Sequence, residues 1–130
     1  MTDIHYLVWS TILTFVMVIV ASVIRGRSWE KGRELSGFGN RDDLPPPTPL
    51  ADRSERAANN MKENMIFFLG ALLAARLAGA APDRLALYCA IFFWARVVYF
   101  PLYLAGIKYF RSAVWAVGAY GIARLLIAAL

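Results

Sequence analysis

The segment that decides the fold is Ile4–Ile24, with the sequence IHYLVWSTILTFVMVIVASVI, and it carries no acidic or basic side chain apart from a neutral His5. Its length matches the roughly 20 residues that an α-helix needs to cross about 30 Å of hydrocarbon. Asp3 and His5 stand where a cleaved signal peptide would carry basic residues, and the apolar run is longer than such a peptide needs. The segment therefore predicts a retained membrane-spanning helix.

Three further apolar segments follow: Met65–Ala81, which Arg76 interrupts, then Leu85–Leu104 and Ala113–Leu130. Apolar residues make up 59% of the 130 residues and charged residues 18%. A soluble domain of this size could not cover so much apolar surface. We therefore predict an all-α fold, an antiparallel four-helix bundle integral to a membrane, forming a single domain over residues 1–130. The predicted helices cover about 4–24, 53–80, 84–105 and 111–130.

Residues 25–52 differ in character, because they are polar, rich in glycine and contain Pro45-Pro46-Pro47-Thr48-Pro49. Such a segment lies outside the hydrocarbon, and its proline run should be extended and stiff. Asp52 is the predicted N-cap of the second helix, with Glu55 as its capping-box partner. That helix should end before Pro82.

The basic residues predict an orientation. Ten fall on one side of the expected bundle and three on the other, with Arg96 between them. The ten are Arg25, Arg27, Lys31, Arg33, Arg41, Arg53, Arg56, Lys62, Lys108 and Arg111, and the three are Arg76, Arg84 and Arg124. This asymmetry places both long connections in the cytoplasm and both termini on the non-cytoplasmic side.

The net charge of +5 is explained by this topology and by anionic membrane lipid, so we expect no nucleic-acid partner. The chain has one cysteine, Cys89, and one histidine, which excludes an internal disulfide and offers no metal-ligand spacing. Arg76 and Arg124 lie near helix ends and are expected to extend to the membrane interface.

Arg96 is exceptional, because it lies about 12 residues from both Arg84 and Lys108, or some 18 Å from either end of its helix. It should face a protein interior or a watery cavity. Tyr99 and Tyr103 follow at i+3 and i+7 on the same helical face.

On the second helix, Arg56, Asn60 and Glu63 share one face at i, i+4 and i+7. Two interpretations stay open. In the first, Glu63 neutralises Arg96 or Arg56 and holds the helices together. In the second, the cluster binds a small zwitterion with extra carboxylates, because arginines in excess suit carboxylates and one acid suits an ammonium group.

A family resemblance rests on these residues. Arg56-Ala-Ala-Asn59-Asn60-Met-Lys-Glu63 resembles the Arg-x-x-x-Asn-x-x-Glu motif of the MAPEG family, the membrane-associated proteins in eicosanoid and glutathione metabolism. Arg96-x-x-Tyr99-x-x-x-Tyr103 is similar to the third-helix motif of that family, and Arg111-Ser112 falls near its catalytic arginine. Asn40-Arg-Asp-Asp43 is similar to a loop motif, Asn-Pro-Glu-Asp, of some members.

The resemblance implies a homotrimer with glutathione as co-substrate, bound between subunits near the cytoplasmic face. It implies that Arg111 lies against the sulfur, with Ser112 or a tyrosine hydroxyl assisting as a hydrogen-bond donor, and that six residues hold glutathione. These are Arg56, Asn60, Glu63, Arg96, Tyr99 and Tyr103. Asn59, Met61 and Asn64 depart from residues found in some members, and Arg25, Arg27 and Arg33 compete as the loop arginine of the site.

The expected function is that of a glutathione-dependent membrane transferase or peroxidase. Its thiolate would attack a hydrophobic electrophile or a lipid hydroperoxide that enters from the bilayer. One alternative is a non-catalytic lipid-binding or scaffold member of the same family. A four-helix drug exporter is disfavoured, because Ile4–Ile24 has no acid to couple protons. The short chain without targeting signals favours a bacterial inner membrane.

Overall fold

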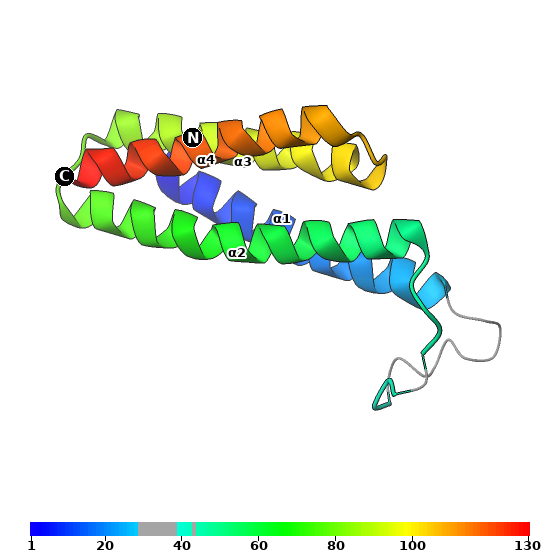
Figure 1. Ribbon diagram of the computed structural model, residues 1–130. Coiled ribbons are helices and arrows are strands. Elements are labelled where there is room, and N and C mark those ends of the chain that lie inside the picture. The colour runs from blue at the N-terminus through cyan, green and yellow to red at the C-terminus, as the bar shows by residue number, and fades with distance from the viewer. Residues whose placement is uncertain (29–38, 43) are drawn as a thin grey trace.

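The computed structural model describes residues 1–28, 39–42 and 44–130. Within these residues the chain forms helices and no strand, which confirms the predicted all-α bundle. The four helices run antiparallel to their neighbours in the chain (Figure 1). They are α1 (Asp3–Arg27), α2 (Pro49–Leu77), α3 (Pro82–Leu104) and α4 (Lys108–Ala129).

The bundle has two distinct ends. We call the end with the α1–α2 connection and the α3–α4 turn the loop end, and the end with both chain termini and the α2–α3 turn the terminal end. α2 and α3 each contact all three other helices, whereas α1 and α4 do not contact each other in the described part of the chain. α2 and α3 therefore form the centre of the bundle, with α1 and α4 on its flanks.

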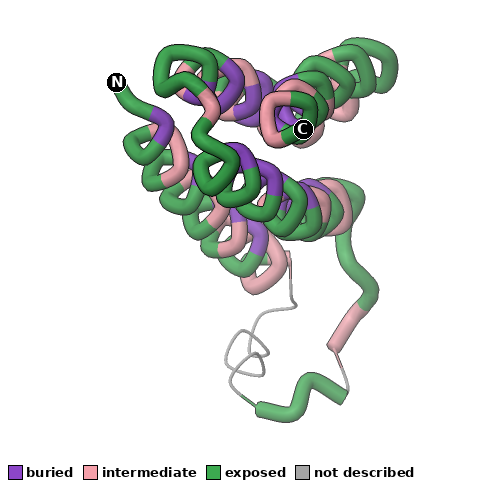
Figure 2. The backbone as a smooth tube through the Cα atoms, turned by 90° about the vertical axis from the view of Figure 1, so that its left-hand side faces the viewer, coloured by how far each residue is buried: buried purple, intermediate pink, exposed green. Residues whose placement is uncertain are grey.

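The core takes side chains from all four helices. Phe68 of α2 and Phe92 of α3 stack with their ring centroids 4.1 Å apart. Met17, Leu72 and Leu125 are buried in the same cluster. Figure 2 shows buried residues on the inward sides of the helices and exposed residues around the outside.

α1, α3 and α4 are long and apolar enough to cross a membrane. α2 is more polar, because Lys62, Glu63 and Arg76 interrupt its apolar part. Its 29 residues would nevertheless extend about 44 Å, the full length of the bundle. Large apolar side chains remain exposed on the outer faces, among them Phe15, Ile66 and Leu77. Such surfaces suit contact with lipid, so the chain is an integral membrane protein.

α2 begins earlier than predicted. Thr48 is its N-cap, since the Thr48 Oγ1 accepts a hydrogen bond of 3.2 Å from the Ala51 N–H. Pro49 takes the first helical position, where its fixed φ is favourable and its missing N–H costs nothing. The predicted cap of Asp52 with Glu55 is wrong: Asp52 lies inside the first turn and pairs with Arg56 at 2.8 Å.

The other boundaries differ by one to three residues from those predicted. Thr2 and His5 form a capping box that starts α1 at Asp3, and α1 continues to Arg27. Arg25 and Arg27 in its last turn favour this extension, because cations stabilise the negative end of the helix dipole. α3 starts directly at Pro82, again with proline in the first turn.

The α3–α4 turn is tied to the start of α2. Gly106 has a φ of +76°, a conformation that L-residues with a side chain adopt only with strain. The Arg53 Nε donates a 3.0 Å hydrogen bond to the carbonyl oxygen of Leu104, one of the acceptors left without a partner at the end of α3. This bond joins the beginning of α2 to the end of α3 at the loop end.

At the terminal end, charged side chains find partners within the subunit. Asp3 is buried and accepts two hydrogen bonds from Arg76, of 2.5 Å from Nε and 3.1 Å from Nη2. Arg124 donates a 2.8 Å bond to the Tyr88 hydroxyl. Arg76 therefore does not simply extend to the membrane interface, as the sequence suggested, but joins α2 to α1.

Candidate functional site

Arg96, in the middle of α3, is 1% exposed, which confirms the prediction that it faces a protein interior. Its Nη1 donates to the Asn60 Oδ1 at 3.1 Å and its Nη2 donates to the Asn64 Oδ1 at 2.7 Å. The guanidinium carbon lies 5.3 Å from the ring centroids of both Phe92 and Tyr99. Among the described residues no carboxylate pairs with this buried cation.

Two asparagines of α2, Asn60 and Asn64, act together to hold Arg96. The Asn64 Nδ2 donates to the carbonyl oxygen of Asn60 at 2.8 Å and approaches the Asn60 Oδ1 at 3.3 Å. Asn64 was not predicted as a site residue, although its i+4 spacing from Asn60 could have indicated it. The Asn60 Oδ1 thus faces two N–H donors.

The interpretation in which Glu63 neutralises Arg96 or Arg56 is wrong for the subunit. Glu63 is exposed and forms no ion pair with the residues that the structure describes, while Arg56 pairs with Asp52. The reason is helical geometry, since each residue turns the helix by about 100°. Glu63 and Asn64 therefore point to different sides of α2, and Asn64 is the one that faces α3.

A groove opens at the loop end, between the start of α2 and the α3–α4 turn. It encloses about 520 Å³, and we call it the loop-end groove. Its polar and charged lining residues are Asp52, Arg53, Arg56, Tyr103, Lys108 and Arg111. Four cations thus face one acid, so the groove has an excess of positive charge.

A chain of contacts connects this groove with the buried arginine. Tyr99 stands against Tyr103 edge-on with their ring centroids 5.4 Å apart, and the Arg111 guanidinium lies 4.7 Å from the centroid of the Tyr103 ring. At the buried end of this row of contacts, the Arg96 guanidinium lies over the ring of Tyr99. The structure therefore brings Arg96, Tyr99, Tyr103 and Arg111 into one continuous row.

A family model for the MAPEG family matches residues 6–130. The chain belongs to the MAPEG family. No curated protein matches the chain. This membership confirms the resemblance drawn from the motifs of α2 and α3. The MAPEG family includes glutathione-dependent transferases and peroxidases and also members without catalytic activity.

The remaining predicted MAPEG site residues lie less centrally. Ser112 is exposed, and its Oγ donates a 3.3 Å bond to the carbonyl oxygen of Lys108 instead of pointing into the groove. Arg56 and Arg111 line the groove, whereas Asn60 lies half-buried beside Arg96. Arg53, which sequence analysis counted only among the topology-setting cations, lines the groove as well.

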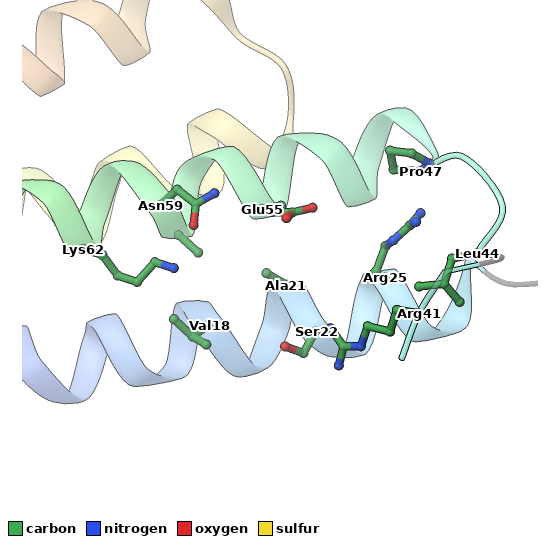
Figure 3. A pocket seen from close by; sticks show the side chains of 11 residues that line it. Val18, Ala21, Ser22, Arg25, Arg41, Leu44, Pro47, Glu55, Asn59 and Lys62 are labelled. Carbon is green, nitrogen blue, oxygen red and sulfur yellow. The ribbon is translucent and has the colours of Figure 1, made fainter. Parts of the chain in front are cut away.

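A second pocket of about 460 Å³ lies between α1 and α2 at the same end of this MAPEG subunit (Figure 3). Arg25 of α1 and Glu55 of α2 both line it, and the Arg25 Nη2 donates a 2.8 Å bond to the carbonyl oxygen of Pro45. Arg25 is therefore the loop arginine with a defined position beside a pocket, while Arg27 is exposed. Arg33 and Asp43 lie outside the described residues.

Chemically, the loop-end groove of this MAPEG subunit is suited to an anion. Guanidinium groups bind carboxylates through two parallel hydrogen bonds, and Arg111 is held by stacking on Tyr103. A cation fixed in this way also stabilises charge that develops beside it during a reaction.

Proposed function

We propose that this MAPEG member is a glutathione-dependent transferase or peroxidase that acts at the loop-end groove. The observation that carries the proposal is the charge of this groove, where Arg53, Arg56, Lys108 and Arg111 stand against Asp52. Glutathione carries two carboxylates and one ammonium group, so an arginine-rich groove with one acid nearby complements it.

In this proposal Arg111 activates the thiol. A free thiol has a pKa of about 8.5, and a neighbouring cation lowers it by favouring the thiolate. Because Arg111 stacks on Tyr103, its charge is already in place before the thiol arrives. Arg56, Asn60 and Glu63 hold the rest of the tripeptide.

The thiolate then reacts with a hydrophobic partner. In a transfer reaction, the sulfur forms a bond to an electrophilic carbon, and the leaving group departs with the electron pair of its bond. In a peroxidase reaction, the sulfur attacks a hydroperoxide oxygen, the O–O bond breaks, and the alkoxide takes up a proton to become an alcohol. A second glutathione converts the resulting sulfenic acid to a disulfide and releases water.

The proposal includes a homotrimer in a bacterial inner membrane, with the loop end on the cytoplasmic side. The loop-end groove is open in the single subunit, and Glu63 is exposed without lining it. In a cyclic trimer each subunit would cover the groove of its neighbour, so the three grooves would be equivalent. Native mass spectrometry in a mild detergent tests this arrangement, and a monomer would contradict it.

One observation favours the alternative, a non-catalytic lipid-binding member. A groove of about 420 Å³ between α3 and α4 is lined by apolar side chains alone, including Trp94, Val98 and Val117. This groove could hold an acyl chain of a lipid as well as a hydrophobic substrate.

The test of the proposed function is the ultraviolet absorbance of thiolate on mixing the purified protein with glutathione. We expect absorbance that saturates with glutathione and falls when a hydrophobic electrophile is added, because the thiolate is consumed. Protein that binds glutathione without raising thiolate absorbance would support the non-catalytic alternative instead.

A further inference from the structure

The orientation of the Asn60 carboxamide is determined by its surroundings. Its Oδ1 faces the Arg96 Nη1 at 3.1 Å and the Asn64 Nδ2 at 3.3 Å. Guanidinium and amide N–H groups are donors, so an acceptor must stand opposite them. A flipped carboxamide would place its own N–H groups against two donors, and the flip is therefore disfavoured.

This orientation leaves the Asn60 Nδ2 as an outward-facing donor. It donates to no acceptor among the residues that the structure describes, and Asn60 is only half-buried. The positive charge of Arg96 on the Oδ1 side polarises the carboxamide, which strengthens the donor on the other side. A ligand group that meets Asn60 must therefore be an acceptor.

Arg96 itself has little freedom to move. Asn64 holds its Nη2 at 2.7 Å, and two aromatic rings flank the guanidinium. On α4, Gly118 leaves the space that Arg96 fills, because a Cβ there would lie 3.2 Å from the Arg96 Nε and 3.4 Å from its Nη2. Three helices thus fix the group that orients Asn60.

We propose that Arg96 and Asn64 are positioning residues that never touch the ligand and that fix Asn60 as a hydrogen-bond donor to a carboxylate or peptide carbonyl oxygen of glutathione. This inference rests on the proposed function and deepens it. It also assigns Arg96 a role different from the direct contact that the family resemblance implied. An uncompensated cation behind Asn60 suits an anionic ligand in front of it.

A purely structural role would give a different outcome. Burial of a cation that is paired only with neutral amides opposes folding, so structure alone does not require this arrangement. The proposal instead requires energetic coupling: Asn64 and Arg96 affect ligand affinity only through Asn60. A double-mutant cycle measures such coupling directly.

The experiment measures glutathione affinity by calorimetry with full-length protein in detergent. The variants are Asn64→Leu, Arg96→Lys and Asn60→Ala, and the double variants that combine Asn60→Ala with each of the other two. We expect Asn64→Leu and Asn60→Ala each to raise Kd about tenfold, as expected for the loss of one oriented hydrogen bond. In the Asn60→Ala background, Asn64→Leu and Arg96→Lys should change Kd less than twofold. The control is Asn59→Leu, an exposed asparagine one residue before Asn60, which should bind like wild type.

Asn60→Asp separates affinity from folding. The new carboxylate would pair with Arg96, so the melting temperature should hold or rise, while Kd should rise by at least tenfold because the donor is lost. If Asn64→Leu changes Kd by the same factor with and without Asn60, this inference is overturned and the proposed function is not. Wild-type protein that binds no glutathione would overturn the proposed function and this inference together.

Discussion

At the terminal end, Arg76 lies against the buried carboxylate of Asp3, whereas at the loop end Arg111 lies against the ring of Tyr103 with three other cations beside it. At the terminal end, Arg76 and Asp3 thus satisfy each other's charge inside one subunit. The loop-end groove keeps positive charge in excess, which opposes folding by repulsion and which a bound anion would compensate. The difference separates charges that hold the bundle together from charges that, in the proposed function, bind the ligand.

The largest expected effect is that of Arg111→Ala at the loop end. Loss of the cation beside the sulfur should lower kcat/KM at least about a hundredfold, as loss of one preorganised stabilising group does elsewhere. Glutathione should still bind, because the other cations of the groove remain, while thiolate absorbance should disappear. Arg111→Lys should keep partial activity, since it retains the charge and loses the planar fork.

The matched control for that variant lies at the other end. Arg84→Ala removes an exposed cation of the terminal end and should leave the thiolate signal at the wild-type level. If Arg111→Ala also leaves turnover unchanged, Arg111 is only an anchor for the start of α4, and the comparison of the two ends fails.

Glu63→Gln should have the next largest effect. The substitution keeps the shape of the side chain and removes the charge that complements an ammonium group. We expect the KM for glutathione to rise by an amount equivalent to about 1–3 kcal/mol, with kcat little changed. Steady-state kinetics over a range of glutathione concentrations measure both values, and an unchanged KM would remove Glu63 from the site.

Gly121→Ala tests the packing of the terminal half. A Cβ at Gly121 would lie 2.9 Å from the carbonyl oxygen of Tyr88 and 3.1 Å from the backbone nitrogen of Phe92, so α3 and α4 would have to separate. We expect a loss of about 1–3 kcal/mol in unfolding free energy, measured by thermal or denaturant unfolding in detergent. Gly70→Ala is the control, because a Cβ there meets nothing within 4 Å.

The smallest effect should follow Asp3→Ala at the terminal end. Arg76 would lose its partner but could reach solvent, because its side chain is 47% exposed. The melting temperature should fall by a few degrees, while glutathione affinity and thiolate absorbance stay unchanged. A change in affinity would mean that the two ends are coupled, contrary to the separation drawn here.

Much of the fold could be predicted from the sequence, because runs of uncharged residues of membrane-spanning length allow few structures. The burial of Arg96 followed from its distance to either helix end, and its row with Tyr99 and Tyr103 followed from their spacing. The start of α2 was missed, since Pro47-Thr48-Pro49 is typical of an extended linker until Thr48 is seen to cap the helix.

The side-chain partners were harder to predict, because they join residues far apart in the chain. Asp3 and Arg76 are separated by 73 positions, and only the packing of α1 on α2 brings them together. Asn64 was considered a departure from a motif, yet it faces Arg96, whereas Glu63 at the adjacent motif position does not. Both residues lie about one helical turn from Asn60, so their spacing could not show which of them contacts Arg96. The answer depends on which face of α2 packs against α3.

The hydrogen bond from Arg53 to Leu104, together with the left-handed Gly106, has a consequence for how the protein is made. Both features belong to one polypeptide, so a newly inserted subunit acquires the shape of its groove as soon as α2, α3 and α4 have packed. In the proposed homotrimer, assembly would then enclose a groove that each subunit has already formed. Ligand binding would accordingly require little reordering of the backbone, and the rate at which mature sites appear would follow the encounter of subunits.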